Sequence, residues 1–579
     1  MSVPSTPRLR FGTGRVVLTV LCLSALALAA CSSGNSSSST SANTVAAPVD
    51  TSAPSIDTTP ATVAPSSSAT ESSAPAETTA LAAPAPTSGA GGTLRVAIAE
   101  APGVLDPHVF TGNFLLLDML YEPLVKYGKG GVIEPALAES FVVAPDGLKA
   151  TFTLRKGVTF HDGTTFDAAA VKWNFDRWVG VKDYNFFKTS EVISEVKVVD
   201  PQTVELLLSK PYPPLLGELA IVRPVRFLSP TSAGADGKFA KAVGTGPWKL
   251  DTSSETGATF SRNGSYWDAK PTQSSVVFSV IPDSQTRAAA LRSGEQDLIG
   301  GAYLAPMTPV EAKDLQGADG VSVLVGEPDT TLFMAFNTKG QAGEKAVREA
   351  ISHALDTSAL NNALYAGFGK PASTFFPPSV PDAGTAKAIV YDTAMAKSIL
   401  DAAGWKQSGK TREKAGKTLE LTLLIPSAPV HGIGDARTLS EAVAASLGEV
   451  GIKVTIKAVD SGAYFDERLK ATYDLAFEET YGAPYDPSST SVSYLTTTGG
   501  DVPVWKSPGL DTLVNTAVFA DDAARPAAYQ AVFDYLGEQT AFVPITYRPR
   551  FWAAGKGVSG FTVPLTEYTM DLTGVMLTR

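Results

Sequence analysis

The sequence predicts an α/β fold of mixed sheets with flanking helices, preceded by a disordered tether. Over residues 93–579, stretches that alternate between apolar and polar residues are interspersed with stretches of helical periodicity. Residues 32–92 are rich in Ser, Thr, Ala and Pro and contain no aromatic residue, so they cannot bury enough apolar surface to fold. The length of 579 residues indicates several domains.

The chain begins with the pattern of an export signal. Three arginines precede an uncharged run, residues 16–30, which is shorter than the ~20 apolar residues that cross a bilayer. The run ends in Leu-Ala-Ala followed by Cys31, and this end resembles the cleavage box of bacterial lipoproteins. The resemblance implies a signal peptide over residues 1–30 and a lipid on Cys31 that holds the protein at the outer face of a membrane. A plain uncleaved anchor is the alternative.

Charge and cysteine content exclude several classes of protein. The net charge of −11 argues against a nucleic-acid partner, which requires a basic surface. The only two cysteines, Cys22 and Cys31, lie in the first 31 residues. The folded part therefore has no disulfide, no Cys-ligated zinc and no Cys nucleophile.

The expected elements follow from apolar periodicity and turn residues. Asp200-Pro201 divides residues 196–208 into two strands, and Gly404 closes the helix expected at residues 393–403. Strands are predicted at residues 93–100, 148–154, 196–208, 419–425, 454–459 and 474–477, and helices at residues 114–121, 168–178, 344–355 and 393–403.

A series of motifs carries a family resemblance. The stretches Pro135-Ala-Leu-Ala-Glu-Ser, Leu154-Arg-Lys-Gly-Val-Thr-Phe-His-Asp-Gly and Gly244-Thr-Gly-Pro-Trp occur in this order. Together with later motifs, they make residues 92–579 resemble the family 5 extracellular solute-binding proteins, the receptors of peptide and nickel ABC importers. The resemblance implies a bilobal fold of the periplasmic binding protein type II with an extra lobe, which closes around solute by a hinge motion and docks on a permease.

The resemblance also implies the order of the lobes. Residues 31–92 form the lipidated linker, residues 93–330 form lobe I with a small lobe II inserted at about 132–243, residues 331–540 form lobe III, and residues 541–579 return to lobe I.

Within the family, the sequence looks most like the nickel-binding branch. The stretches at 216–228, 376–381, 411–414 and 481–487 carry this likeness. That branch commonly places a metal-ligating histidine after its Pro-Tyr-Asp-Pro motif, whereas residues 495–501 contain no histidine. The resemblance therefore supports the fold and the transport role more strongly than nickel, and no metal ligand or cofactor is assigned.

The candidate ligand-binding residues combine one guanidinium with aromatic side chains. The fork of Arg223 would clasp a carboxylate, although a structural salt bridge is the alternative for this residue. Each tyrosine could present a flat face to solute or belong to the core. The candidates are Arg223, Tyr464, Tyr481, Tyr485, Phe110, Phe186, Phe187 and His108.

Nucleotide binding is rejected, and hydrolysis is left without support. Residues 404–411 match the phosphate-loop expression, but they follow a helix and lead into a strand, which reverses the required context. There is neither a G-x-S-x-G elbow nor an H-E-x-x-H motif, so we expect no enzyme. Paired carboxylates such as Asp521-Asp522 need no motif, however, and leave hydrolysis open.

The function expected from these observations is that of a monomeric lipoprotein at the cell surface or in the periplasm. It would capture a peptide or a small carboxylate-bearing solute, a nickel chelate included, and deliver this solute to an ABC permease. The alternative is a cell-surface hydrolase or ligand sensor that reuses the binding fold.

Overall fold

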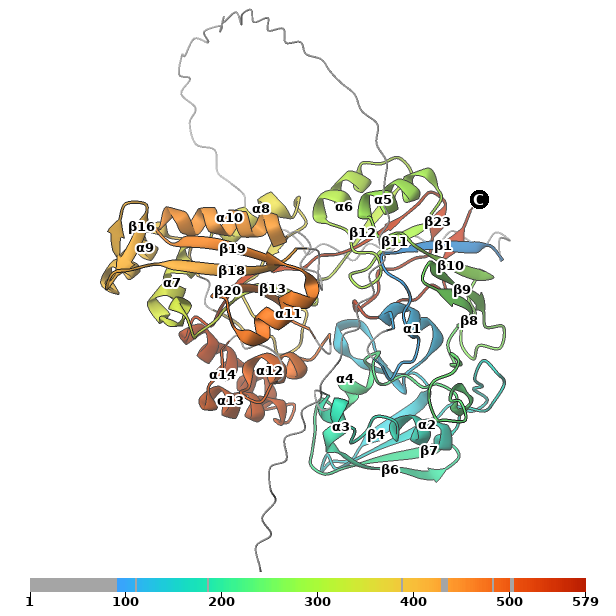
Figure 1. Ribbon diagram of the computed structural model, residues 1–579. Helices are drawn as coiled ribbons and strands as arrows, with labels where there is room; N and C mark the ends of the chain where they lie inside the picture. The colour runs from blue at the N-terminus through green and yellow to red at the C-terminus, as the bar shows by residue number, and fades with distance from the viewer. Residues whose placement is uncertain are drawn as a thin grey trace, which may run out of the picture. The chain divides into compact units, whose positions relative to one another are not determined.

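The computed structural model describes residues 91–109, 112–184, 187–386, 389–427, 436–481, 484–499 and 505–578. Their main sheets have seven, four and six strands (Figure 1). We call these sheets, each with its helices, lobes I, II and III. The expected signal peptide, Cys31 and nearly all of the linker lie outside the described residues.

Lobe I is built around β1 (Thr93–Ile98), which pairs in parallel with β10 and β11. Leu94, Val96 and Ile98 are buried, as expected for an inner strand. Helices α5 (Ser284–Ser293) and α6 (Pro309–Gln316) pack on β11 and β12. The sheet order is β12 (Ser322–Gly326), β22 (Arg550–Ala554), β11 (Leu298–Gly300), β1, β10 (Ser275–Val280), β9 (Gly257–Arg262) and β8 (Trp248–Ser254).

Lobe II is an antiparallel sheet with a helix against it. The alternation predicted for residues 148–154 is confirmed, since Ala150, Phe152 and Leu154 are buried and their neighbours are half-buried. Helix α2 (Ala168–Phe175) contacts β6 and β7 and ends three residues earlier than predicted. Trp178, beyond its end, is still buried in the core. The sheet order is β4 (Ala138–Val143), β5 (Lys149–Leu154), β7 (Thr203–Leu208) and β6 (Ile193–Asp200).

Lobe III combines a mixed sheet with a group of packed helices. Helix α10 (Ala436–Glu449) lies against β18 and β19, and α12, α13 and α14 pack on one another (Figure 1). The sheet order is β14 (Lys370–Pro371), β21 (Phe542–Tyr547), β13 (Thr331–Phe336), β20 (Leu475–Glu479), β18 (Glu420–Pro426) and β19 (Lys453–Val459). The other helices are α7 (Lys345–Ala354), α8 (Thr357–Leu364), α9 (Thr393–Ala402), α11 (Ser461–Lys470), α12 (Ser488–Leu495), α13 (Pro508–Val518) and α14 (Arg525–Glu538).

The chain crosses between the sheets of lobes I and III twice. Residues 327–330 connect β12 to β13, and residues 548–549 connect β21 to β22. The amide of Arg548 donates to the carbonyl oxygen of Thr330 over 3.1 Å, so the two crossing segments are joined. The predicted return to lobe I at residue 541 is wrong by one strand. Strand β21 remains in the lobe III sheet, where Val543 and Ile545 are buried in its core.

Shorter elements complete the part of the chain that the structure describes. Helix α1 (Phe114–Leu120) begins at Asn113, whose side chain accepts from the amides of Leu115 and Leu116. No helix among the described residues is both long and apolar enough to span a bilayer. The remaining elements are β2 (Val125–Tyr127), β3 (Ile133–Pro135), α3 (Lys188–Val192), α4 (Leu215–Leu219), β15 (Lys406–Ser408), β16 (Thr411–Lys414), β17 (Lys417–Thr418), β23 (Val558–Ser559), β24 (Met576–Leu577) and four 3-10 turns, Lys129–Gly131, Lys182–Tyr184, Pro230–Ser232 and Gln341–Gly343.

Candidate functional site

Arg223 follows α4 and is held against the start of α1. Its guanidinium carbon lies 3.6 Å from the ring centroid of Phe114, and its Nη1 donates to the carbonyl oxygen of Gly112 over 3.2 Å. Burial lowers the pKa of Arg223 to about 10, which still leaves the side chain cationic at neutral pH. The site therefore contains a partly desolvated cation stacked on an aromatic ring, an arrangement that stabilises the cation and suits the recognition of an anion.

Two tyrosines extend the aromatic surface beside Arg223. Phe114 contacts Tyr303 with ring centroids 5.4 Å apart and Tyr568 with centroids 5.0 Å apart. Tyr303 and Tyr568 are themselves stacked, at 5.2 Å and an interplanar angle of 26°. Both tyrosines act electrostatically on Arg223. Sequence reasoning missed Phe114, Tyr303 and Tyr568 as site residues, because none of them lies in a motif that distinguishes a site residue from a core residue.

A small pocket adjoins this aromatic surface. It lies between Tyr568 and Glu567 of lobe I and residues of lobe III, and it encloses only about 10 Å³. This volume is far below the ~300–1,000 Å³ of most ligand sites, so the walls lie nearly in contact in this arrangement. The lining residues are Asp329, Thr330, Phe376, Val380, Thr480, Tyr481, Pro484, Glu567 and Tyr568.

Charged groups surround the pocket where the chain crosses between lobes I and III. Arg548 forms an ion pair with Glu479, whose carboxylate also accepts from the hydroxyl of Thr330 at 2.6 Å. Arg550 lies 3.6 Å from Asp329. Burial, together with the charges of Asp329 and Glu479, raises the pKa of Glu567 well above its ordinary value.

Of the predicted tyrosines, Tyr481 lines the pocket and Tyr485 contacts residues outside lobe III. Tyr481 lines the pocket and packs edge-on against Tyr494, with centroids 5.2 Å apart. The hydroxyl of Tyr485 donates to the carbonyl oxygen of Leu565 over 2.9 Å, and its ring lies 5.3 Å from that of Tyr127. Tyr485 therefore connects the loop after β20 to residues outside lobe III.

The family is determined by comparison with known proteins. Residues 132–501 match the model of the bacterial extracellular solute-binding proteins, family 5. The chain belongs to this family. It is 32% identical over 462 residues to the nickel-binding periplasmic protein of Escherichia coli K12, covering 77% of this chain and 87% of that protein.

Two crystal structures resemble this solute-binding protein over most of its length. An ABC transporter substrate-binding protein from Sinorhizobium meliloti is 40% identical with a TM-score of 0.71. NikA from Brucella suis in complex with Fe(III)-EDTA is 32% identical with a TM-score of 0.79. Each match covers 84% of this chain and 100% of the other. The fold is thus that of the type II periplasmic binding proteins, and the E. coli and S. meliloti relatives are named as binding proteins.

Two predicted site residues of the solute-binding protein are core residues instead. Tyr464 is 2% exposed, and its hydroxyl donates to the carbonyl oxygen of Phe477 over 2.9 Å. Phe187 is also 2% exposed and packs against Trp178, with centroids 5.6 Å apart. Neither residue is among those that line the pocket. Phe110 and Phe186 lie outside the described residues.

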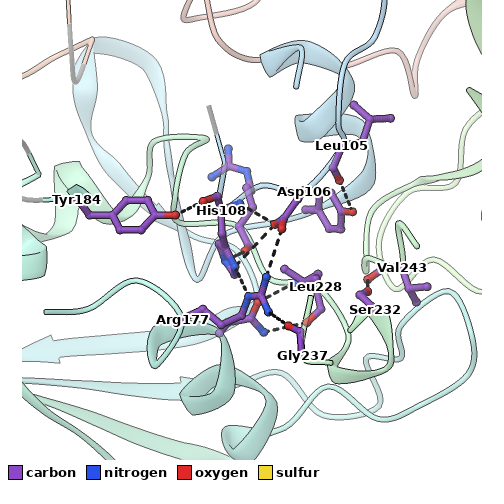
Figure 2. A network of polar contacts seen from close by, with 12 residues as sticks. Leu105, Asp106, His108, Arg177, Tyr184, Leu228, Ser232, Gly237 and Val243 are labelled. Carbon is purple, nitrogen blue, oxygen red and sulfur yellow. Dashed lines mark hydrogen bonds and ion pairs between the residues drawn. The ribbon is translucent and has the colours of Figure 1, made fainter. Parts of the chain in front are cut away.

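The side chain of His108 is likewise hydrogen-bonded within the protein (Figure 2). Arg177 Nε donates to His108 Nδ1 over 2.9 Å, and His108 Nε2 lies 3.2 Å from the carbonyl oxygen of Arg226. Nδ1 therefore carries no proton, and Nε2 is the donor. Burial and the charge of Arg177 lower the pKa of His108 to about 3. Both ring nitrogens of His108, which was predicted to bind solute, are therefore engaged within the protein in this arrangement.

His161 has a comparable structural role in its turn motif. The amide of Gly244 donates to Nδ1 over 3.2 Å, and Nε2 lies 3.0 Å from the carbonyl oxygen of Gly246. Burial lowers the pKa of His161 to about 4. Among the described residues, no three His, Cys, Asp or Glu side chains form a group that could hold a metal ion.

The rejection of the phosphate-loop match is confirmed by the local structure. Gly404 follows α9, and Gly409 and Lys410 form the turn between β15 and β16. The segment is therefore a hairpin and not a loop that leads into a helix. Asp521 precedes α14, where its side chain accepts from the amides of Ala523 and Ala524, so this carboxylate serves the helix start.

Proposed function

We propose that this protein captures a small carboxylate-bearing solute, a peptide or a metal chelate, in the pocket between lobes I and III. It then delivers this solute to the permease of an ABC importer. The observation that carries the proposal is the guanidinium of Arg223 stacked on Phe114 beside the Tyr303–Tyr568 pair. An anionic group on the solute would offset the cost of burying this cation.

The aromatic surface gives the solute an apolar contact next to the charged one. Tyr303 and Tyr568 combine large apolar faces with hydroxyl groups, which suits a ligand of mixed polarity. A few fixed polar groups in an otherwise apolar site are typical of small-molecule binding. A metal would be carried as cargo through the carboxylates of its chelator, which matches the E. coli and B. suis relatives named for nickel and an iron chelate.

We also propose that Cys31 carries the lipid that anchors the protein, and that residues 32–92 act as the spacer. A flexible chain of this length spans about 40–50 Å on average. The receptor would then work as a monomer within reach of its permease while remaining attached to the membrane.

Native mass spectrometry of the gently desalted full chain in detergent tests the proposed solute class. We expect a retained molecule whose mass corresponds to a peptide or a carboxylate chelator, with elemental analysis reporting any metal. A retained molecule without a carboxylate would contradict the proposal. An adduct-free chain that binds no member of a peptide and carboxylate-chelate panel would contradict it as well.

A further inference from the structure

The cluster of charged residues at the crossing segments has members from lobe I, from lobe III and from the crossing segments themselves. Asp329 and Arg548 lie in the crossing segments themselves, and Glu479 ends strand β20 of lobe III. Glu567 belongs to the C-terminal segment between β23 and β24, whose neighbours pack into the core of lobe I. A rotation about residues 327–330 and 548–549 would therefore change the distance between Glu567 and Glu479.

The surroundings of Glu567 depend on lobe III. The pocket that Glu567 lines is completed by Thr480, Tyr481 and Pro484 of lobe III. Glu567 is 5% exposed in this arrangement, and its amide donates to Asp329 Oδ2 over 3.2 Å. Separation of the lobes would open this wall and bring water to the carboxyl group of Glu567.

The charges in the cluster do not balance when every group is ionised. The carboxylates of Asp329, Glu479 and Glu567 face the guanidinium groups of Arg548 and Arg550. Among these five groups, three negative charges face two positive ones, and the next cation, Arg223, is stacked on Phe114 beside Tyr568. Burying the third carboxylate as an ion is costly unless a proton neutralises it. The other titratable groups around Glu567 are Tyr303 and Tyr568, while Tyr365 lies near Arg548 and Glu479.

We propose that closure of lobe III on lobe I takes up one proton, which the carboxyl group of Glu567 holds at the crossing segments. The proposal rests on the function proposed above, because it makes solute capture dependent on pH. A rising pH opens the protein and releases solute, and a falling pH favours retention.

The direction of the pH dependence follows from the two environments of Glu567. In the closed form, burial and the charges of Asp329 and Glu479 raise the pKa of this group. In the open form, hydration returns the pKa toward about 4.3, the ordinary value. Between these two values the closed form holds a proton that the open form lacks. The ratio of closed to open protein therefore falls by up to about tenfold per pH unit as pH rises.

Fluorescence energy transfer across the lobes measures this ratio without any solute. The full chain carries Cys22→Ser and Cys31→Ser, which leaves no other cysteine, and dyes are attached at Glu195→Cys in lobe II and Asp522→Cys in lobe III. Both positions are exposed. We expect the closed fraction to fall between pH 5 and pH 8.

Two substitutions separate the proton on Glu567 from other effects of pH. Glu567→Gln mimics the protonated carboxyl and should hold the closed fraction high at pH 8. The control Glu327→Gln changes an exposed carboxylate in the same crossing segment and should behave as the unsubstituted protein. Should Glu567→Gln fail to fold, Asp329→Asn removes the neighbouring charge and should weaken the pH dependence. A closed fraction that is constant with pH, or that still changes in Glu567→Gln, would overturn the proposal. Solute identity plays no part in either outcome.

Discussion

The guanidinium carbon of Arg223 lies 3.6 Å from the ring centroid of Phe114. This contact joins the loop after α4 to the first residue of α1, and Phe114 in turn meets Tyr568 at the wall of the pocket. The cation and the aromatic surface are therefore parts of one arrangement, and the predictions below separate their contributions.

Replacement of Phe114 by leucine keeps an apolar side chain but removes the aromatic face under Arg223. A desolvated cation–π contact contributes about 1–2 kcal/mol, so we expect solute affinity to fall about five- to thirtyfold. Isothermal calorimetry on Phe114→Leu measures this loss. A matched change at an aromatic contact remote from the site, Phe141→Leu against Phe152 in lobe II, should leave affinity unchanged. Unchanged affinity in Phe114→Leu would refute the role given to the ring.

The hydroxyl of Tyr485 should stabilise the closed form through its bond to Leu565. Tyr485→Phe removes one hydrogen bond, worth about 1 kcal/mol, so we expect solute to dissociate about fivefold faster. Stopped-flow release experiments measure the rate. Tyr535→Phe is the control, because its hydroxyl bonds to Ser507 within lobe III at the same distance of 2.9 Å. Equal rates in both variants would show that Tyr485 does not hold the lobes together.

The buried histidines should make the protein sensitive to acid. The pKa of His108 is lowered to about 3 and that of His161 to about 4, whereas an unfolded histidine titrates near 6.5. Below that value the unfolded state binds protons that the folded state excludes. Stability is therefore complete above about pH 6.5 and is lost as the pH falls toward these lowered values.

Urea unfolding at pH 7 and pH 4.5 measures this effect. We expect a loss of a few kcal/mol in the unsubstituted protein and a smaller loss in His108→Gln, whose side chain can still donate to Arg226 and accept from Arg177. Asp106 contacts the same network and has a raised pKa, so its partial protonation in acid is common to both proteins. An identical loss in both would exclude His108 as a source of the acid sensitivity.

Acylation of Cys31 should keep the protein in the membrane fraction. A single short chain anchors weakly, and more than one chain anchors stably, so we expect metabolic labelling with a fatty acid and a diacylated N-terminal peptide at residue 31. Cys31→Ala should abolish the label, while Cys22→Ala should retain it. A label that survives Cys31→Ala would contradict the assignment.

Local patterns allowed the sequence to predict the strands and helices well. The alternation at 148–154 and the helix closed by Gly404 depend on neighbouring residues, and both occur in the structure. The boundary at residue 541 came from the family resemblance. Strand β21 is buried over five of its six residues, so it shows no alternation that would have distinguished the two sheets.

The site was predicted less completely, and the reason is the direction of side chains. Arg223, Tyr481 and Tyr485 were named from motifs. Tyr481 lines the pocket, Arg223 stacks on Phe114, and Tyr485 bonds to Leu565. Tyr464 was named on the same grounds but lies in the core, since an aromatic residue on an amphipathic helix satisfies both roles until the neighbouring strands are placed. Tyr303 and Tyr568 come from distant parts of the chain and form a pair only after folding.

The most direct test of the account is the effect of Arg223→Ala on solute affinity. Calorimetry with the solute identified by native mass spectrometry should give a loss of one to two orders of magnitude, as buried arginine anchors do. The melting temperature of the solute-free protein should be nearly unchanged. The control Arg437→Ala removes an exposed arginine and should bind normally. Equal affinity in Arg223→Ala and the unsubstituted protein would contradict the claim that Arg223 anchors the solute.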